Sequence, residues 1–163
     1  SEKKEIVEVE AILRSNIDKG LIDLRNTIIL SETEKVTATQ FKVESAAYSS
    51  SPEFQFKDGK WVTKDPSKEW QVDIASKLVD VIAMTRIKDF VSPPPAGKEL
   101  YKIAIGDEKN PTKFYFSFYT VKDQIYARDL NQKANNEAYL MEDSMKLALP
   151  KTESEWKIKA PTK

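Results

Sequence analysis

The chain has 163 residues, of which 40% are hydrophobic and 32% are charged, a composition that is ordinary for a globular domain. Lysine and arginine together number 26, as do aspartate and glutamate, so no net charge draws the chain to nucleic acid or to an anionic membrane. The sequence holds no cysteine and no histidine, which excludes disulfides and thiolate metal sites and removes the commonest general base.

Targeting and membrane-spanning signals are missing from the sequence. No apolar run approaches the roughly 18 residues needed to cross a bilayer. The opening residues, Ser1–Lys4, do not resemble the start of a signal peptide. We therefore expect either a cytosolic protein or a mature fragment whose targeting segment lies upstream of Ser1.

Three runs in the first part of the chain alternate between apolar and polar residues, as half-buried strands do. They are Ile6–Leu13, Leu21–Leu30 and Thr37–Val43. The polar stretch Ser31–Lys35 is expected to connect the second run to the third. Three such runs in succession predict an antiparallel meander. A charged helix over residues 1–14 is the competing interpretation of the first run.

The stretch Phe54–Val91 predicts a β-hairpin followed by the main helix of the fold. Asp58 and Gly59 lie between two alternating runs, and this pair favours a type I′ turn, in which both central residues have positive φ. Further along, the apolar residues recur with the period of a helix, which we expect over about residues 73–90 with Asp73 as its N-cap. Its buried face would carry Ile74, Ala75, Leu78, Val79 and Ile82.

A proline-rich break separates this helix from a second set of strands. Ser92–Gly97 contains three consecutive prolines, through which neither helix nor strand continues. We favour a rigid connector over a ligand for a proline-reading domain, because the stretch has no PxxP frame. The elements expected beyond it are the strands Leu100–Ile105, Phe114–Tyr119, Gln124–Arg128 and Ala138–Met141 and the short helix Asp143–Leu149. The predicted class is α+β, with an antiparallel sheet of meander and hairpins packed by one main helix.

A short sequence pattern occurs twice, once in the hairpin and once near the end of the sequence. Trp61–Pro66 and Trp156–Pro161 share the pattern W-x-x-K-x-P. We predict that residues 1–150 form a single domain. Residues 151–163 would be either a terminal strand, whose tryptophan plugs the edge of the core, or the start of a second repeat. For Trp61 we predict a buried ring that closes the junction between hairpin and helix, with an acceptor for its indole N–H.

Three tyrosines are the candidate binding residues. The phenylalanines that alternate along Phe114–Tyr119 are expected to face the core. The opposite face would then display Tyr115, Tyr119 and Tyr126, a cluster suited to a sugar or to a protein contact. The alternatives are that other elements cover this face, or that the phenylalanine and tyrosine faces are reversed. A nucleic-acid platform would need more basic residues among the aromatic ones, so no nucleic-acid partner is predicted.

The sequence offers little for catalysis, cofactors or metals. The serine–lysine neighbours on predicted helices lack the S-x-x-K spacing of known hydrolases, and the four glycines form no phosphate-binding loop. Asp129–Lys133 opens like a calcium loop, but a lysine takes the fifth position and no glycine follows. We therefore predict no enzyme, no cofactor and no metal site.

Several of these segments together resemble a known family. They are Gly59–Pro66 (GKWVTKDP), Asp73 at the start of a helix that ends near a phenylalanine, Leu100–Gly106 (LYKIAIG) and Gln124–Asp129 (QIYARD). Over residues 51–150 the chain resembles a bacterial envelope-associated family of unknown function, which has a repeated W-x-hydrophobic-x-x-P…D…helix unit. Some members are encoded near gliding-motility-type ABC transporter components. The chain departs from the family in one place: three prolines and Gly97 stand where a tyrosine-glycine-leucine segment and a proline are expected.

The resemblance implies a periplasmic or membrane-anchored location, with any anchor in a segment upstream of Ser1, and a protein partner in the envelope. It brings no catalytic residues. Two classes of function follow: a non-catalytic structural or protein-interaction module of the bacterial cell envelope, or a ligand-binding module that holds a carbohydrate or a small apolar molecule. An interior cavity would favour a carrier, whereas a solidly packed domain would favour the interaction module.

Overall fold

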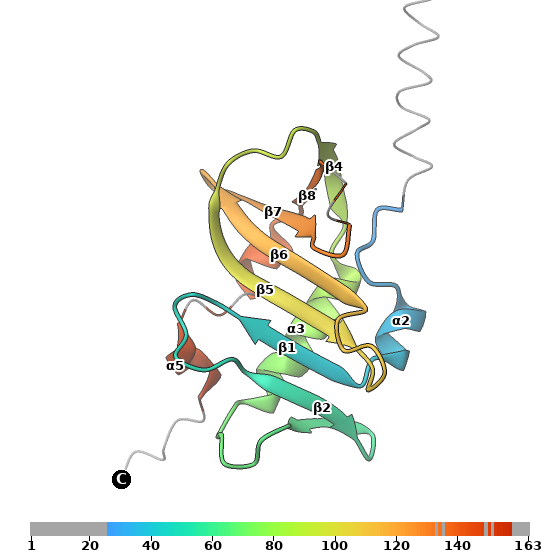
Figure 1. Ribbon diagram of the computed structural model, residues 1–163, viewed down its shortest axis with the longest axis vertical. Helices are drawn as coiled ribbons and strands as arrows, with labels where there is room; N and C mark the ends of the chain where they lie inside the picture. Colours follow the sequence, from blue (N-terminus) through green and yellow to red (C-terminus); the bar gives the residue numbers. More distant parts are fainter. Residues whose placement is uncertain (1–25, 133, 135, 149, 151, 158–163) are drawn as a thin grey trace, which may run out of the picture.

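The computed structural model describes residues 26–132, 134, 136–148, 150 and 152–157. Within this part the fold is α+β, as predicted: an antiparallel sheet of eight strands with one main helix packed against it (Figure 1). The helices are α2 (Glu32–Thr37), α3 (Val72–Met84), α4 (Ser144–Ala148) and α5 (Glu153–Trp156). The strands are β1 (Gln40–Glu44), β2 (Glu53–Lys57), β3 (Lys60–Thr63), β4 (Ile87–Val91), β5 (Lys98–Gly106), β6 (Phe114–Val121), β7 (Gln124–Asp129) and β8 (Ala138–Met141).

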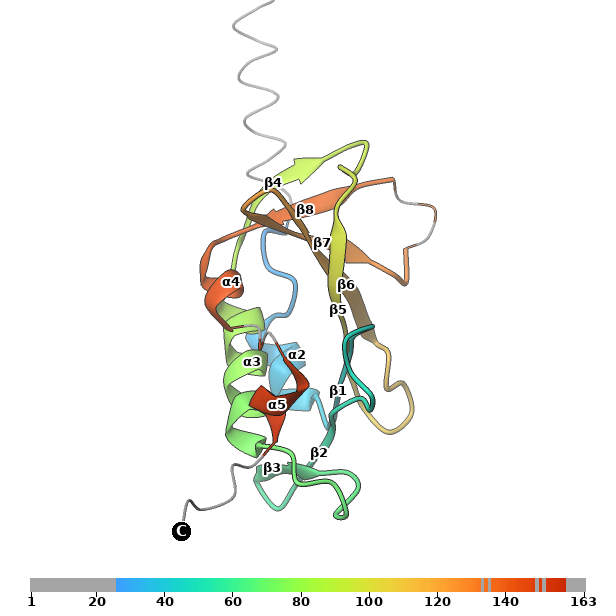
Figure 2. The ribbon, with the colours of Figure 1, turned by 90° about the vertical axis from the view of Figure 1, so that its left-hand side faces the viewer.

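The strand order across the sheet is β3-β2-β1-β5-β6-β7-β8-β4, so β3 and β4 are its two edges. These edge strands are also the elements that precede and follow α3 in the chain. Figure 2 shows that the helices lie on one side of the sheet, and that α3 runs between the two ends of a bent sheet. One face of the sheet therefore forms the core with α3, and the other faces outward.

The hairpin between β2 and β3 confirms the turn predicted from the sequence. Asp58 has a φ of 51° and Gly59 a φ of 77°, as a type I′ turn requires. The strands pair with Lys57 opposite Lys60 and with Phe56 opposite Trp61.

The main helix is confirmed, but two of its predicted details are wrong. The N-cap is Gln71. Asp73 is an exposed residue of the first turn, where its negative charge interacts favourably with the positive end of the helix dipole. The helix ends at Met84 rather than near residue 90. Residues 87–91 form β4 instead, because they find a distant pairing partner in β8.

The N-terminal predictions have mixed outcomes. Ile6–Leu13, the competing helix over residues 1–14, and Leu21–Leu30 up to residue 25 all lie outside the described residues. Between Asn26 and Leu30 the structure has a single bridge from Ile28 to Arg86 and no strand. The third run is confirmed in part: β1 begins at Gln40 and buries Phe41 and Val43, whereas Thr37 is the last residue of α2.

The connection predicted at Ser31–Lys35 is wrong, because helix α2 begins there. Ser31 and Glu34 form a capping box: the Glu34 N–H donates to Ser31 Oγ at 3.3 Å, and the Ser31 N–H donates to Glu34 Oε2 at 2.9 Å. The two bonds satisfy backbone N–H groups that a helix start otherwise leaves without partners. The S-x-x-E signal was present in the sequence.

The second half of the chain follows the predictions closely. The strands predicted after the proline-rich segment appear as β5, β6, β7 and β8, and the predicted last short helix is α4. Lys122, with a φ of 55°, turns β6 into β7.

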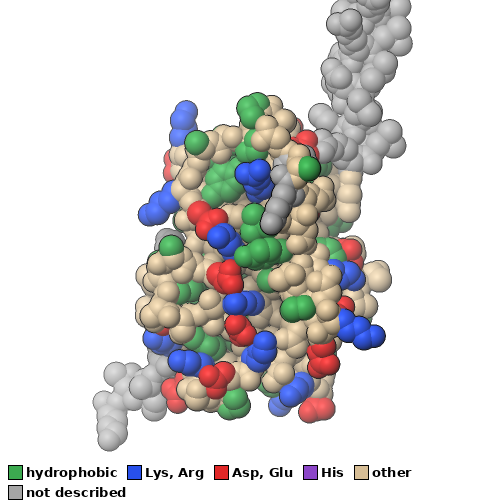
Figure 3. Space-filling view, in the orientation of Figure 1, with side chains coloured by type: hydrophobic (Ala, Val, Ile, Leu, Met, Phe, Trp, Pro, Cys, Tyr) green, Lys and Arg blue, Asp and Glu red, His purple; other side chains and the backbone are tan. Residues whose placement is uncertain are grey.

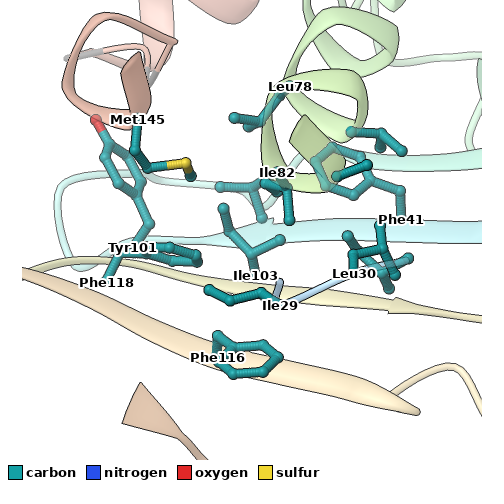
Figure 4. Close-up of a cluster of buried hydrophobic side chains, with 14 of the residues drawn as sticks. Ile29, Leu30, Phe41, Leu78, Ile82, Tyr101, Ile103, Phe116, Phe118 and Met145 are labelled. Carbon is teal, nitrogen blue, oxygen red and sulfur yellow. The ribbon is translucent and has the colours of Figure 1, made fainter. Parts of the chain in front are cut away.

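The core lies between α3 and the sheet. Figure 4 shows Leu78 and Ile82 of α3 above Ile103 of β5 and Phe116 and Phe118 of β6. The predicted helix face is largely confirmed. The buried residues of α3 are Ala75, Leu78, Val79, Ile82 and Ala83, while Ile74 is partly buried.

The C-terminal segment belongs to the same core. Trp156 in α5 is fully buried, its ring centroid lies 5.9 Å from that of Phe54, and its indole N–H donates to the Tyr48 hydroxyl at 2.9 Å. The Trp156 carbonyl accepts a bond from the Gln71 N–H at 2.6 Å, just before α3. This segment therefore closes the core at the start of α3.

Hydrogen bonds from Ser49 to Glu153 join the β1–β2 loop to the C-terminal segment, within which Glu153 also pairs with Lys157. Glu153 accepts a bond from Lys157 Nζ at 2.9 Å and from the Ser49 N–H at 2.6 Å. These bonds lower the pKa of Glu153 to about 2, with Lys157 as the main cause.

None of the helices among the described residues has the length and apolar character that crossing a bilayer requires.

Candidate functional site

A surface groove lies beside the edge strand β3. It has a volume of about 690 Å³ and is bounded by α2, the β2–β3 hairpin and the first half of α3. We call it the β3 groove. Its apolar lining is Val36, Ala38, Phe56, Trp61, Val62, Val72 and Val79. Since these residues come from three elements far apart in the sequence, the groove exists only in the folded chain.

The β3 groove carries unusual apolar exposure. Val36 is 78% exposed and Phe56 is 39% exposed. The third exposed large apolar side chain of the described residues is Met84, at the far end of α3 and outside the groove. An apolar patch rimmed by charged groups is typical of a binding surface.

Alternation along β2 explains why Phe56 is exposed. Phe54 and Phe56 point to the helix-facing side of the sheet, but Phe54 is fully buried beneath α5, next to Trp156. Phe56 lies two residues nearer the turn, where its ring meets Trp61 edge-on at 5.4 Å. The core therefore ends within the hairpin.

Trp61 lies between the groove and the core. Its ring also contacts Phe41 edge-on at 6.2 Å, and it lines the groove together with Val72 of α3. The predicted place at the junction of hairpin and helix is confirmed. The ring is partly buried rather than enclosed, because one side faces the β3 groove.

An ion pair links two of the three walls of the groove. Lys35 of α2 and Asp80 of α3 form an ion pair at 2.9 Å, and Asp80 is the main cause that raises the pKa of Lys35. The capping box described above holds the start of α2. The ion pair therefore joins two of the three walls of the groove, α2 and α3.

The three predicted tyrosines lie on the outer face of the sheet, as the alternation implied, but they do not form an exposed cluster. Tyr119 and Tyr126 are each only 8% exposed, and their rings stack at 5.7 Å. The expectation of an exposed triad is therefore wrong for these two. The residues that pack around the pair are Val91, Val121, Ala138 and Leu140.

The segment before β5 explains why Tyr119 is covered. A Cβ at position 97 would lie 2.6 Å from Tyr119 Cδ2, so the glycine lets this segment pack directly on the ring. The Tyr119 hydroxyl is buried with no hydrogen-bond partner among the described residues, and burial raises its pKa. The proline-rich connector and β4 thus cover what the sequence suggested was surface.

Tyr115 lies apart from that pair, in a charged network on the outer face. Its hydroxyl donates to Glu44 at 3.2 Å, and Glu44 also binds Lys42 at 2.8 Å. Lys42 is the main cause that lowers the pKa of Glu44. Tyr115 borders a shallow depression of about 310 Å³ together with Arg128. Figure 3 shows acidic and basic side chains interspersed over this face of the sheet.

Metal ligation finds no support in the part of the chain that the structure describes. No three acidic side chains there are grouped closely enough to hold a metal ion, and the sequence has no histidine or cysteine. The β3 groove thus offers shape and apolar surface rather than a constellation of reactive groups.

Comparison with protein-family models, with curated proteins and with solved structures finds no match to this chain. The resemblance to the envelope-associated family stays a prediction.

Proposed function

We propose that this chain is a non-catalytic protein-interaction module of the bacterial cell envelope, and that it binds its protein partner in the β3 groove. The observation that carries the proposal is the exposure of Val36 and Phe56 around a preformed groove. Burying one large apolar side chain contributes about 1.5–3 kcal/mol. Two such side chains, with part of Trp61, are a suitable centre for a modest protein interface.

The chemistry of the groove supports binding rather than turnover. Of the acidic residues that line it, Asp80 is held by Lys35 and Asp73 is exposed to solvent at the start of α3. Neither is paired with a second carboxylate among the residues that line the groove. A catalytic acid or base needs a nearby partner that tunes it, which this arrangement does not supply.

The location belongs to the proposal and rests on the family resemblance alone. We propose an extracytoplasmic protein, periplasmic or held at the membrane by a segment upstream of Ser1.

Ligand binding is the second candidate. A volume of about 690 Å³ lies within the range of small-molecule sites, roughly 300–1,000 Å³. Phe56 and Trp61 also offer aromatic faces to a carbohydrate or an apolar molecule. The β3 groove runs along an edge strand of the sheet, which favours a chain-like partner over a small carrier ligand. A small molecule that co-purifies with the wild-type chain, but not with Phe56→Ser, would favour this second candidate.

Photo-crosslinking in the cells that make the protein tests the proposal. Benzoylphenylalanine placed at position 36 is expected to capture a protein and give one adduct of defined mass. The same group at position 84 replaces another exposed apolar residue, 67% exposed and outside the groove, and is expected to give no such adduct. Adding Phe56→Ser to the position-36 variant should reduce the adduct about tenfold, the equivalent of losing the burial of this ring.

The control for folding is the thermal unfolding of each variant. Changes at positions 36 and 84 should leave it unchanged because both are well exposed, whereas Phe56→Ser should lower the unfolding temperature while leaving the chain folded, because its ring also packs on Trp61. Equal capture from positions 36 and 84, or capture from position 84 alone, would contradict the assignment of the groove.

A further inference from the structure

We infer that the partner binds as an extended segment that adds to the free edge of β3 as an antiparallel strand, with acidic residues at both ends of the paired stretch. This inference rests on the proposed function and names the class of partner. Three features of the described residues support it: the direction of the β3 backbone groups, the position of the groove, and the charges that flank Val62.

The hairpin fixes which β3 backbone groups face outward. Next to a two-residue turn, Lys57 and Lys60 form a hydrogen-bonded pair, and the pairs then alternate between bonded and non-bonded. Two bonds agree with this pattern. The Lys64 N–H donates to the Glu53 carbonyl at 3.0 Å, and the Phe56 N–H points away from β3, to the Thr39 carbonyl, at 2.9 Å.

It follows that the backbone groups of Trp61 and Thr63 point away from β2. No backbone hydrogen bond between described residues uses them on the free side, because β3 is the last strand of the sheet. Two N–H donors and two C=O acceptors therefore stand in line along the edge. Such a row is what strand addition uses.

The β3 groove reaches the helix-facing side of the sheet, where an added strand would place half of its side chains, and it also touches Lys60 and Val62 on the outer side. Trp61 and Thr63 share the helix-facing side of the sheet with Phe56. Partner residues opposite them would point the same way, toward Val36 and Val72. An added strand thus fills the apolar groove and satisfies the edge at once.

The lysines on the outer side of β3 favour acidic residues at the two ends of the partner segment. Lys60, Val62 and Lys64 share that side, because they alternate with Trp61 and Thr63. Lys64 holds Glu53 at 3.2 Å, whereas Lys60 makes no ion pair among the described residues. Carboxylates at the two ends of the partner stretch would face these ammonium groups.

The same register disfavours a second copy of the chain. Two β3 edges that pair about Val62 would place Lys60 of one copy opposite Lys64 of the other, and like charges in direct opposition are destabilising. The other edge strand is a weaker candidate. The Ile87 N–H already donates to the Thr27 carbonyl at 2.7 Å there, and the exposed residues are Lys88 and Asp89, of opposite charge.

A designed peptide tests strand addition with the full chain. The probe is acetyl-Glu-Ile-Thr-Ile-Glu-amide, which puts glutamates opposite Lys64 and Lys60 and isoleucines opposite Thr63 and Trp61. Titration into the ¹⁵N-labelled chain is expected to shift the Trp61 and Thr63 amides and to slow their hydrogen exchange. N-methylation of either isoleucine should weaken binding about tenfold or more, because it removes a bond to β3 and leaves a carbonyl without a donor. N-methylation of the threonine should leave affinity within about twofold, because that N–H points away from β3.

The charge requirement is tested by a reciprocal swap. Lys60→Glu should weaken the peptide about two- to tenfold, in keeping with an exposed ion pair that becomes a like-charge contact. A peptide with lysine as its last residue should recover that loss with Lys60→Glu. Lys88→Glu changes the net charge equally at the other edge strand and should have no effect.

Each result decides the inference separately from the proposed function. Equal tolerance of N-methylation at all positions, or no change at the Trp61 and Thr63 amides at millimolar peptide, would overturn strand addition. The photo-crosslinking result at position 36 would still test the proposed function independently of these outcomes. Concentration-dependent self-association in sedimentation, strengthened by Lys60→Glu because that change puts a carboxylate opposite Lys64 of the other copy, would instead identify a second copy as the occupant and also overturn the inference.

Discussion

Replacing Trp156 by alanine is expected to lower the free energy of unfolding by about 3–5 kcal/mol. The side chain is fully buried against Phe54, so its loss removes the transfer free energy of a large ring and leaves a cavity. It also removes the donor that binds the Tyr48 hydroxyl at 2.9 Å. Urea unfolding of the full chain, followed by far-UV circular dichroism, measures the change.

Trp156→Phe is the matched control, because it keeps most of the ring and removes the indole N–H. It should cost less than the alanine variant, with about 0.5–1.5 kcal/mol of its loss due to the hydrogen bond. A loss below about 1 kcal/mol for Trp156→Ala would mean that the last residues do not complete the core. That result would favour the interpretation of W-x-x-K-x-P as the start of a separate repeat.

Leu78→Ala is expected to destabilise the chain by about 2–5 kcal/mol. Leu78 is 1% exposed and belongs to the core between α3 and the sheet, where Figure 4 shows it on the helix side, above Ile82. Its removal takes away buried apolar surface and leaves a cavity beside Ile82. The same urea experiment measures the loss.

The neighbouring Lys77 provides the control, because it is exposed on the same helix. Lys77→Ala should change the stability by no more than about 0.5 kcal/mol. If Leu78→Ala changed the stability as little as Lys77→Ala, that result would contradict the packing of α3 on the sheet described above.

The parts of the fold that local chemistry determines could be predicted from the sequence. Asp58 and Gly59 fixed the hairpin, since few residue pairs accept two positive φ angles in succession. The period of Ala75, Leu78 and Ile82 located the buried face of α3. Both signals act within a few residues, and here the distant contacts agree with them.

Elements that depend on distant partners were harder to predict. Residues 87–91 continue an apolar pattern that suits a helix, and only their pairing with β8 makes them a strand. Tyr119 and Tyr126 were expected on the surface because nothing nearby in the sequence covers them. Their cover comes from the connector, β4 and β8, which the fold brings to them.

The β3 groove was not predicted, for the same reason. Val36 lies in a short polar stretch, Phe56 belongs to a hairpin and Val72 begins the main helix. Each has an unremarkable local role, and their meeting follows from the bend of the sheet around α3. The capping box at Ser31 and Glu34 was the one local signal that could have located the helix α2 that forms one wall.

Amide hydrogen exchange of the full chain, with and without the partner captured from position 36, tests the central claim most directly. The account predicts slower exchange at residues 60–63 of β3 and at residues 35–37 of α2, with little change across β6 and β7. Protection confined to the outer face around Tyr115, with none along β3, would contradict it.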